Sequence, residues 1–268
     1  MKAAKIIKNV TLVFFALTFL GHLVSCKESP TIEKIQQRGT VLVGTTGDYR
    51  PLSYMEPETG TYWGFDLDLA GEIAKKMNLP LTYVPTSWST LTADVSDPSL
   101  FDFAIGGITI TDARLETMDM SEGYLGNGKT ILCRKEDTVR FTCLDDLNHP
   151  EVRVMVNPGG LNEKFANENL THATVIIWPR NEEIPTKVAE GEADVMITEI
   201  TEAPWYVQND SRLAAPLLDE PFTHGEIGVL MWKGQEDLLE VVNATIREMK
   251  ADGSLKALHE KYGLKYVF

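Results

Sequence analysis

Short apolar runs alternate with amphipathic stretches along almost the whole chain, and this alternation constrains the fold more than any other feature. The run Val41–Thr45 is typical of a buried strand, and Phe65, Leu69, Ile73 and Met77 then fall on one face of a helix over 64–78. The same pattern predicts strands at 81–84, 103–105, 152–156, 175–178 and 194–198, and helices at 162–170 and 184–190. Asn181 can cap the second of these helices. Apolar strands that alternate with amphipathic helices indicate α/β units built on mostly parallel sheets.

Two similar modules therefore lie in series. The segment 237–262 is mostly helical with a break at Gly253-Ser254, and we expect it to return and pack on the first module. That return makes lobe 1 discontinuous, with residues 38–132 and 226–268, and leaves residues 133–225 as lobe 2. The chain then crosses between the lobes twice, near 130–135 and near 221–228.

The first 25 residues have the pattern of a signal peptide. Lys2, Lys5 and Lys8 precede an apolar run over 10–24 that is too interrupted for a membrane-spanning helix. The run ends in Leu-Val-Ser-Cys, which resembles the lipobox of bacterial lipoproteins, so Cys26 becomes the acylated first residue and 26–37 a tether. The alternative is ordinary cleavage with Cys26 incidental. Either way the sequence predicts a periplasmic or cell-envelope protein.

The net charge and the distribution of apolar residues limit what the protein can bind. The formal net charge is −14, and removing the first 25 residues, which carry three Lys and no acidic residue, makes it −17. So acidic a surface repels nucleic acid. No second apolar run approaches a membrane span, so we expect membrane contact only through a lipid anchor.

The cysteines and histidines predict neither a metal site nor a cofactor. Cys133 and Cys143 can form a disulfide in an oxidising compartment, or they can remain two separate buried thiols. Their spacing is not that of a metal or redox site, and the four histidines beyond the signal segment are scattered. The motifs GxSxG, HExxH and GxGxxG are absent from the sequence.

Polar and aromatic residues follow the expected strands, at the edge where open α/β sheets bind their ligands. The candidates from the first module are Asp48, Tyr49, Trp88, Gly107, Thr109 and Arg114, and those from the second are Asn157, Gly160, Glu199 and Glu202. Arg114 offers a planar fork suited to a carboxylate, unless it pairs with Glu116 or Asp119. Tyr49 and Trp88 are suited to the walls of a site for a flat ring. The amides of the segment 157–160, Asn-Pro-Gly-Gly, suit an anion or simply form a tight turn.

Glu202 has two interpretations. Thr201 can cap a helix that begins at Glu202, and a first-turn Glu usually just compensates the helix dipole. The helix terminus lowers a carboxyl pKa, whereas a general acid at neutral pH needs a raised one. Burial in a closed cleft beside a second carboxylate, such as Glu199 or one of the substrate, would supply that shift.

Three segments resemble the polar amino-acid solute-binding proteins of ABC importers. They are 43–54 (Val-Gly-Thr-Thr-Gly-Asp-Tyr-Arg-Pro-Leu-Ser-Tyr), 64–70 (Gly-Phe-Asp-Leu-Asp-Leu-Ala) and 107–114 (Gly-Ile-Thr-Ile-Thr-Asp-Ala-Arg). The resemblance implies a two-lobed periplasmic-binding-protein type II fold, in which each lobe is a mostly parallel sheet flanked by helices, with a two-segment hinge. It also implies that Arg114 grips a ligand carboxylate and that Glu199 receives an amino group.

Further segments are similar to the cyclohexadienyl dehydratase branch of that family, among them 85–88, 128–130, 156–160, 162–165 and 202–203. This resemblance implies decarboxylating dehydration of prephenate or arogenate without a cofactor, with Glu202 as proton donor and Asn157 orienting the substrate. The sequence departs from the pattern at Leu161, where Thr or Ser is usual, and at Glu199, where Asp is usual. The alternatives are a binding lipoprotein that delivers an amino acid to an ABC permease and an extracytoplasmic sensor module.

Overall fold

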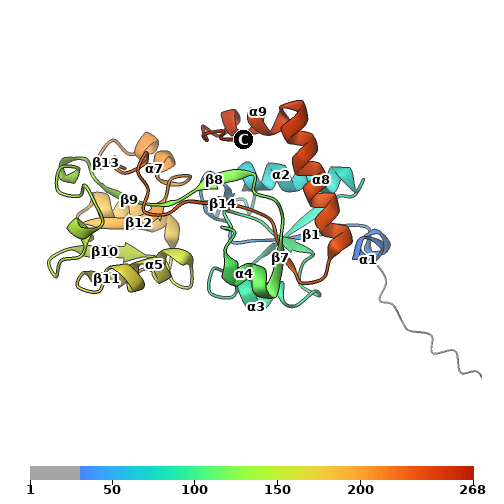
Figure 1. The fold of residues 1–268 in the computed structure, drawn as a ribbon, viewed down its shortest axis with the longest axis horizontal. Helices are drawn as coiled ribbons and strands as arrows, with labels where there is room; N and C mark the ends of the chain where they lie inside the picture. The colour runs from blue at the N-terminus through green and yellow to red at the C-terminus, as the bar shows by residue number, and fades with distance from the viewer. Residues whose placement is uncertain (1–30) are drawn as a thin grey trace, which may run out of the picture.

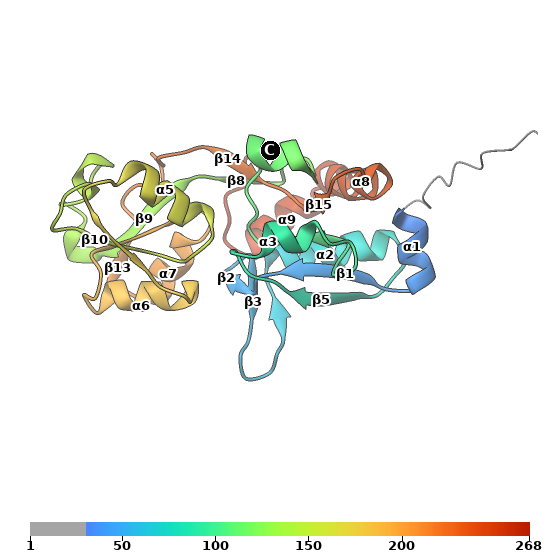
Figure 2. The same cartoon turned by 90° about the horizontal axis from the view of Figure 1, so that it is seen from below.

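The computed structural model describes residues 31–268, which form two lobes joined by a pair of strands (Figure 1). The signal segment and Cys26 lie outside the described residues. The joining strands are β8 (Leu125–Asn127) and β14 (Gly225–Ile227), which pair antiparallel with Gly225 opposite Asn127. A two-segment hinge is thus present, and both views show its strands side by side between the lobes (Figure 2).

Lobe 1 is built on a five-stranded sheet. Its order is β5 (Leu81–Pro85), β1 (Val41–Thr45), β6 (Phe103–Ala104), β15 (Leu230–Trp232) and β7 (Met118–Met120). The strands β5, β1 and β6 are parallel, whereas β15 runs antiparallel to both of its neighbours. A small antiparallel sheet of β2 (Asp48–Tyr49), β3 (Ser53–Met55) and β4 (Tyr62–Trp63) extends from the end of β1.

The helices of lobe 1, all except α4, bury apolar residues in its core. They are α1 (Thr31–Arg38), α2 (Phe65–Lys76), α3 (Leu91–Val95), α4 (Asp112–Thr117), α8 (Glu236–Asp252) and α9 (Ser254–Lys261). Phe65, Leu69 and Ile73 of α2 are buried in the same core as Leu238 and Ile246 of α8, because residues three and four apart share a helix face. The C-terminal segment therefore packs on lobe 1, and its break lies at Gly253, which adopts a left-handed conformation with φ 81°.

Lobe 2 is built on a second five-stranded sheet. Its order is β11 (Thr174–Ile177), β10 (Arg153–Val156), β12 (Val195–Glu199), β9 (Lys129–Arg134) and β13 (Leu213–Ala214), and β9 is antiparallel to both neighbours. The helices are α5 (Leu161–Asn169), α6 (Ile184–Ala189) and α7 (Ala203–Asn209), with short 3₁₀ turns η1 (Lys135–Asp137), η2 (Asp145–Leu147) and η3 (Asn181–Glu183).

The central strands of lobe 2 bury both faces. Val195 and Ile197 of β12 enter one core, while Met196 between them enters the other, as the two-residue period of a strand requires. This explains why residues 195–197 are continuously apolar rather than alternating.

The structure moves one boundary of the lobes. β9 pairs with β12 in the second sheet, so lobe 2 begins at Lys129 and not at residue 133. Antiparallel pairing of the strand after the hinge with a strand some 65 residues later depends on long-range contacts, which local periodicity does not contain. No helix of residues 31–268 is long and apolar enough to cross a membrane.

The predicted disulfide is not formed in the structure. Cys133 lies in the middle of the lobe 2 sheet opposite Val195 and is buried, whereas Cys143 lies on an exposed loop and both are free. The structure therefore agrees with the alternative of two separate thiols, except that only Cys133 is buried and Cys143 is exposed.

Candidate functional site

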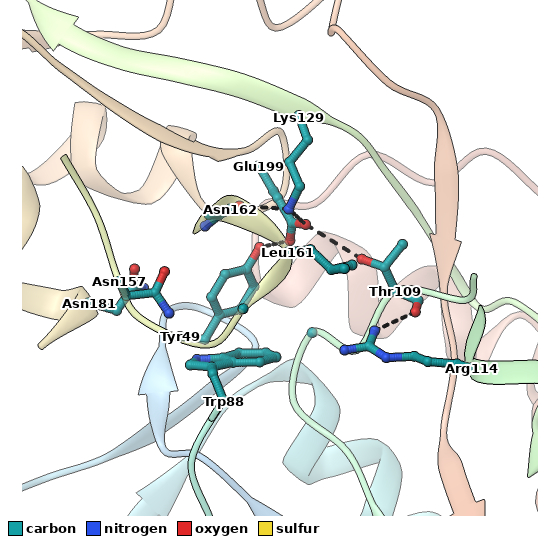
Figure 3. A pocket seen from close by; sticks show the side chains of 12 residues that line it. Tyr49, Trp88, Thr109, Arg114, Lys129, Asn157, Leu161, Asn162, Asn181 and Glu199 are labelled. Atoms are coloured by element: carbon teal, nitrogen blue, oxygen red, sulfur yellow. Dashed lines mark hydrogen bonds and ion pairs between the residues drawn. The ribbon is translucent and has the colours of Figure 1, made fainter. Parts of the chain in front are cut away.

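A pocket of about 320 Å³, counted to its open mouth, lies between the lobes beyond the ends of β1, β10 and β12 (Figure 3). It brings together most of the candidates from the sequence: Tyr49, Trp88, Gly107, Thr109, Arg114, Asn157, Gly160 and Glu199. Four further residues line it, Lys129, Leu161, Asn162 and Asn181. Asp48 and Glu202 lie behind the wall. The two lobes thus contribute opposite sides of one site.

Arg114 is presented to the pocket by α4. The Thr111 side chain accepts a hydrogen bond from the Arg114 backbone amide at the start of this helix, and the guanidinium donates to the carbonyl oxygen of Thr109 over 2.6 Å. Burial lowers the pKa of Arg114, against the field of Glu199, which raises it. Within residues 31–268 no carboxylate lies within 4.0 Å of the guanidinium, and Asp119 instead pairs with Lys233. The rest of its fork is free for a ligand carboxylate.

A buried ion pair occupies the opposite wall. Lys129 of β9 lies directly across from Glu199 of β12, and its ammonium is 2.5 Å from Glu199 Oε1 and 2.6 Å from Asn162 Oδ1. Tyr49, from lobe 1, donates to Glu199 Oε2. Burial raises the pKa of Glu199, but the charge and hydrogen bond of Lys129 and the hydrogen bond of Tyr49 outweigh it, so the pKa lies below its usual value and Glu199 is ionised.

Lys129 was not among the site residues predicted from the sequence. The strand register places Lys129 directly opposite Glu199, the acid at the end of β12. Had the pairing of these two strands been known, Lys129 would have been predicted as the partner of Glu199. The pair leaves both oxygens of Glu199 engaged, Oε1 by Lys129 and Oε2 by Tyr49.

The aromatic wall comes from lobe 1. The rings of Tyr49 and Trp88 meet edge to face with centroids 5.9 Å apart, and Trp88 Nε1 donates to Asp48 Oδ1 over 3.0 Å. Asp48 therefore supports the wall from behind. Its own pKa is raised, because burial outweighs the hydrogen bonds from Thr46 and Trp88. Two rings inclined at 70° form an aromatic corner against which an unsaturated ring can pack.

The turn after β10 brings Asn157 and Gly160 to the pocket. Gly159 adopts φ 77°, and a Cβ there would lie 2.4 Å from Cα of Ser89 in lobe 1, so the close approach of the lobes requires glycine. Asn157 is buried, and within residues 31–268 its Oδ1 has no hydrogen-bond partner. A buried amide oxygen left without a donor is costly, and at a pocket wall a ligand can supply that donor.

Glu202 is completely buried, with no exposed surface, immediately behind the pocket. Its Oε1 accepts from Asn181 Nδ2 over 2.6 Å and from the Tyr206 hydroxyl over 3.4 Å, and its Oε2 accepts from Thr198. Burial is the largest influence and, with the charges of Glu199 and Asp48, raises the pKa of Glu202 to about 8 although Thr198 and Asn181 lower it. At neutral pH Glu202 is therefore mostly the neutral acid.

The local structure around Glu202 differs from the prediction in its capping. The helix α7 begins at Ala203 with Glu202 itself at the N-cap position, and no side-chain hydrogen bond caps it. Thr201 instead donates to Asn127 Oδ1 over 3.1 Å, because the turn directs its hydroxyl towards the hinge. Asn181 does not cap α6 either, since its side chain is directed to Glu202 and Asp48.

The arrangement can bind an anion and supply a proton. Two cationic groups, Arg114 and Lys129, face a pocket that also has an aromatic wall. The carboxyl of Glu202 is separated from this pocket only by the side chain of Asn181. Within residues 31–268 no group of three or more His, Cys, Asp or Glu side chains is placed to hold a metal ion.

The comparisons with known proteins agree with this architecture. The family model of the bacterial extracellular solute-binding proteins, family 3, matches residues 41–265. The cyclohexadienyl dehydratase of Pseudomonas aeruginosa is 37% identical over 219 residues, which are 81% of this chain and 81% of that protein. The crystal structure of an ancestral amino acid-binding protein, a precursor of cyclohexadienyl dehydratase, matches with TM-score 0.80 and 34% identity over 87% of this chain and 99% of that one.

The crystal structure of an ancestral cyclohexadienyl dehydratase is 46% identical and matches with TM-score 0.54 over 88% of this chain and 97% of that one. These likenesses confirm the fold expected from the sequence, the two-lobed periplasmic-binding-protein type II fold.

Proposed function

Because the chain belongs to the bacterial extracellular solute-binding proteins of family 3, we propose that it is a member that has become an enzyme, a cyclohexadienyl dehydratase. The reaction is the decarboxylating dehydration of prephenate, and of arogenate to a lesser degree, to phenylpyruvate or phenylalanine. The family is extracellular, which places the protein in the periplasm or cell envelope. The likeness to the dehydratase of Pseudomonas aeruginosa supports the activity.

The observation that carries this proposal is the complete burial of the Glu202 carboxyl directly behind the pocket, which a solute-binding site does not require. A general acid must hold its proton until the transition state, and the complete burial of Glu202 keeps it protonated at pH 7. A Glu in the first turn of a helix ordinarily stays ionised at the surface, where it compensates the helix dipole. Burying its carboxyl costs folding free energy, and a role as general acid explains why that cost is tolerated.

The proposed reaction balances in atoms and charge. The bond between the ring and its carboxylate breaks, and its electron pair enters the ring as carbon dioxide leaves. The bond from C4 to the hydroxyl oxygen breaks, and that oxygen takes the proton of Glu202 and departs as water. Glu202 is left as a carboxylate and regains its proton from solvent when the lobes open. Arg114 and Lys129 match the two carboxylates of prephenate, Asn157 orients the substrate, and Tyr49 and Trp88 contact its ring.

The ion pair of Lys129 and Glu199 bears on the preferred substrate. An ammonium group binds best to a carboxylate whose charge is not already compensated, whereas Glu199 is paired with Lys129 and also accepts from Tyr49. A 2-oxo acid carries no ammonium and needs no such partner. This observation supports prephenate over arogenate.

Incubating the purified protein with prephenate and recording phenylpyruvate absorbance tests the proposal. We expect turnover, and we expect Glu202→Gln to lower it by about 10²-fold or more, because general acid catalysis contributes roughly that much. The matched control is Glu190→Gln, which changes an exposed Glu on the same lobe and should turn over like the wild type. Full activity in Glu202→Gln would exclude the assigned role.

A second candidate function is an amino-acid-binding lipoprotein that delivers its ligand to an ABC permease. The ancestral amino acid-binding protein shares the fold, and Arg114 suits the ligand carboxylate in either function. This candidate requires Glu199 to leave Lys129 and receive an ammonium group. A tight calorimetric isotherm for an amino acid, without conversion of prephenate, would establish the carrier instead.

Attachment to the membrane is a separate proposal and rests on Cys26 alone. Acylation of that residue would tether the soluble lobes through the segment 26–37. Metabolic labelling with a radioactive fatty acid should mark the wild type and not Cys26→Ala. Equal labelling of both would contradict the anchor.

A further inference from the structure

Asn181 lies between the buried acid and the pocket. It is 1% exposed, begins the turn η3 after β11, and contributes to the pocket wall, which Glu202 does not. Its Nδ2 donates to Glu202 Oε1 over 2.6 Å and to the backbone oxygen of Asp48 over 3.3 Å. The backbone oxygen of Asp48 can only accept, so it fixes the amide nitrogen on this side, and the neighbouring Oδ1 contacts neither partner.

The oxygen of that amide has no partner. Asn181 Oδ1 is buried, and within residues 31–268 no donor reaches it. Asn157 Oδ1, on the same pocket wall, is in the same state. Two buried amide oxygens that line one pocket and lack donors indicate a ligand with hydroxyl or N–H groups.

One of the two bonds of Asn181 Nδ2 crosses between the lobes. Asn181 and Glu202 belong to lobe 2 and Asp48 to the small sheet of lobe 1, so the amide is fully engaged only when the lobes are together. Opening removes the Asp48 oxygen and exposes this side of Glu202 to water. The environment of the acid is therefore completed by closure.

We propose that Asn181 is a positioning residue for the general acid: its amide nitrogen holds the Glu202 carboxyl, and its amide oxygen receives the ring hydroxyl of the substrate. This inference rests on the proposed function. One planar amide then fixes acid and leaving group side by side, so that the hydroxyl donates its own proton to Oδ1 while its oxygen faces Glu202. As Glu202 gives up its proton, the N–H of Asn181 stabilises the negative charge that remains on Oε1.

Several titratable and charged groups surround Glu202 and would share in any change of its titration. Glu199 from the end of β12, Asp48 and Tyr49 from β2 and Tyr206 from α7 interact with it directly, while Arg50 and Glu182 act on Tyr206. The negative charges of Glu199 and Asp48 disfavour the ionised form of Glu202. These charges therefore cannot replace the hydrogen bond from Asn181, and its loss should raise the pKa of Glu202.

The test replaces Asn181 by Leu, which is similar in size and lacks both polar atoms, and by Ala, which lacks them in a smaller side chain and adds no charge beside Glu202. Asn162→Leu is the matched control, because Asn162 also lines the pocket but contacts Lys129 and not Glu202. Two readouts are taken: the pH profile of turnover of prephenate, and a carbon-13 NMR titration of the Glu202 carboxyl, assigned by its loss in Glu202→Gln.

We expect both Asn181 variants to lower kcat by roughly 10-fold or more and to shift the basic limb of kcat, and the NMR titration, to higher pH by about one unit. Asn162→Leu should change KM and leave the titration of Glu202 in place. An unmoved titration in both Asn181 variants would overturn the inference, whatever their activity.

The NMR titration needs no turnover, so the two proposals fail separately. A wild-type protein that does not convert prephenate refutes the dehydratase, while a shifted Glu202 titration in Asn181→Ala still supports the hold of Asn181 on the acid. If Asn181→Leu does not fold, Asn181→Ala decides, since its smaller side chain cannot overpack the site.

Discussion

Glu202→Gln should stabilise the protein, and increasingly so as the pH rises. The carboxyl has a pKa of about 8 when folded and 4.5 as an ordinary Glu, so the folded state retains the proton more strongly than the unfolded chain. Stability from this group is fully present below pH 4.5 and is lost as the pH rises towards 8, because ionisation then favours unfolding. Gln is neutral at every pH and keeps an oxygen for Asn181.

The size of the effect follows from the gap between the two pKa values. Each unit corresponds to about 1.4 kcal/mol, so the total loss above pH 8 is roughly 5 kcal/mol. Between pH 5.5 and pH 8.5 the stability of Glu202→Gln relative to the wild type should grow by roughly 3 kcal/mol. Other titrating groups are common to both proteins and cancel in the difference.

Urea denaturation of both proteins at the two pH values measures this difference. The reasoning is refuted if the difference in unfolding free energy between variant and wild type stays the same within about half a kcal/mol, an interval well below the change expected from the linkage. That result would mean that Glu202 ionises as easily in the folded protein as in the unfolded chain, and the general acid would then have no proton to give at neutral pH.

Three further outcomes are expected. Lys129→Met leaves the buried Glu199 without its cation and should cost roughly 3–5 kcal/mol of unfolding free energy in urea at pH 7; a cost below about 1 kcal/mol would contradict the buried ion pair. Arg114→Met should weaken calorimetric binding of phenylpyruvate by roughly 10-fold or more, and unchanged affinity would show that the carboxylate binds elsewhere. In a Cys26→Ala protein, Cys143 should react promptly with a thiol reagent, whereas Cys133, whose pKa burial raises to about 12, should react only after unfolding.

Local pattern was sufficient for most of the elements. The apolar spacing of Phe65, Leu69 and Ile73 located α2, and the apolar runs located β1, β10 and β12 within one or two residues. These features depend on neighbours three or four positions away in a helix, or two in a strand, which the sequence shows directly.

The sequence predicted those residues of the site that directly follow strands. Tyr49, Arg114, Asn157 and Glu199 were found because the ends of parallel strands meet at one edge. Lys129 was missed because its place depends on an antiparallel pairing across some 65 residues of chain.

Asn181 and Thr201 were misjudged for a related reason. Both have the residue type that caps a helix, and in each the side chain is instead engaged by a tertiary partner, Glu202 for Asn181 and Asn127 for Thr201. Capping preference is a local property of a few tenths to about two kcal/mol, and a buried carboxyl that needs a donor outweighs it.

The pH dependence of kcat/KM for prephenate tests the central claim most directly, because it reports the protonation state of the free enzyme that reacts. If Glu202 is the general acid, activity holds through neutral pH and falls above about pH 8, where Glu202 loses its proton. Activity that instead rises steadily from pH 7 to pH 9 would show that the reacting form is the deprotonated one, and Glu202 could not be the acid.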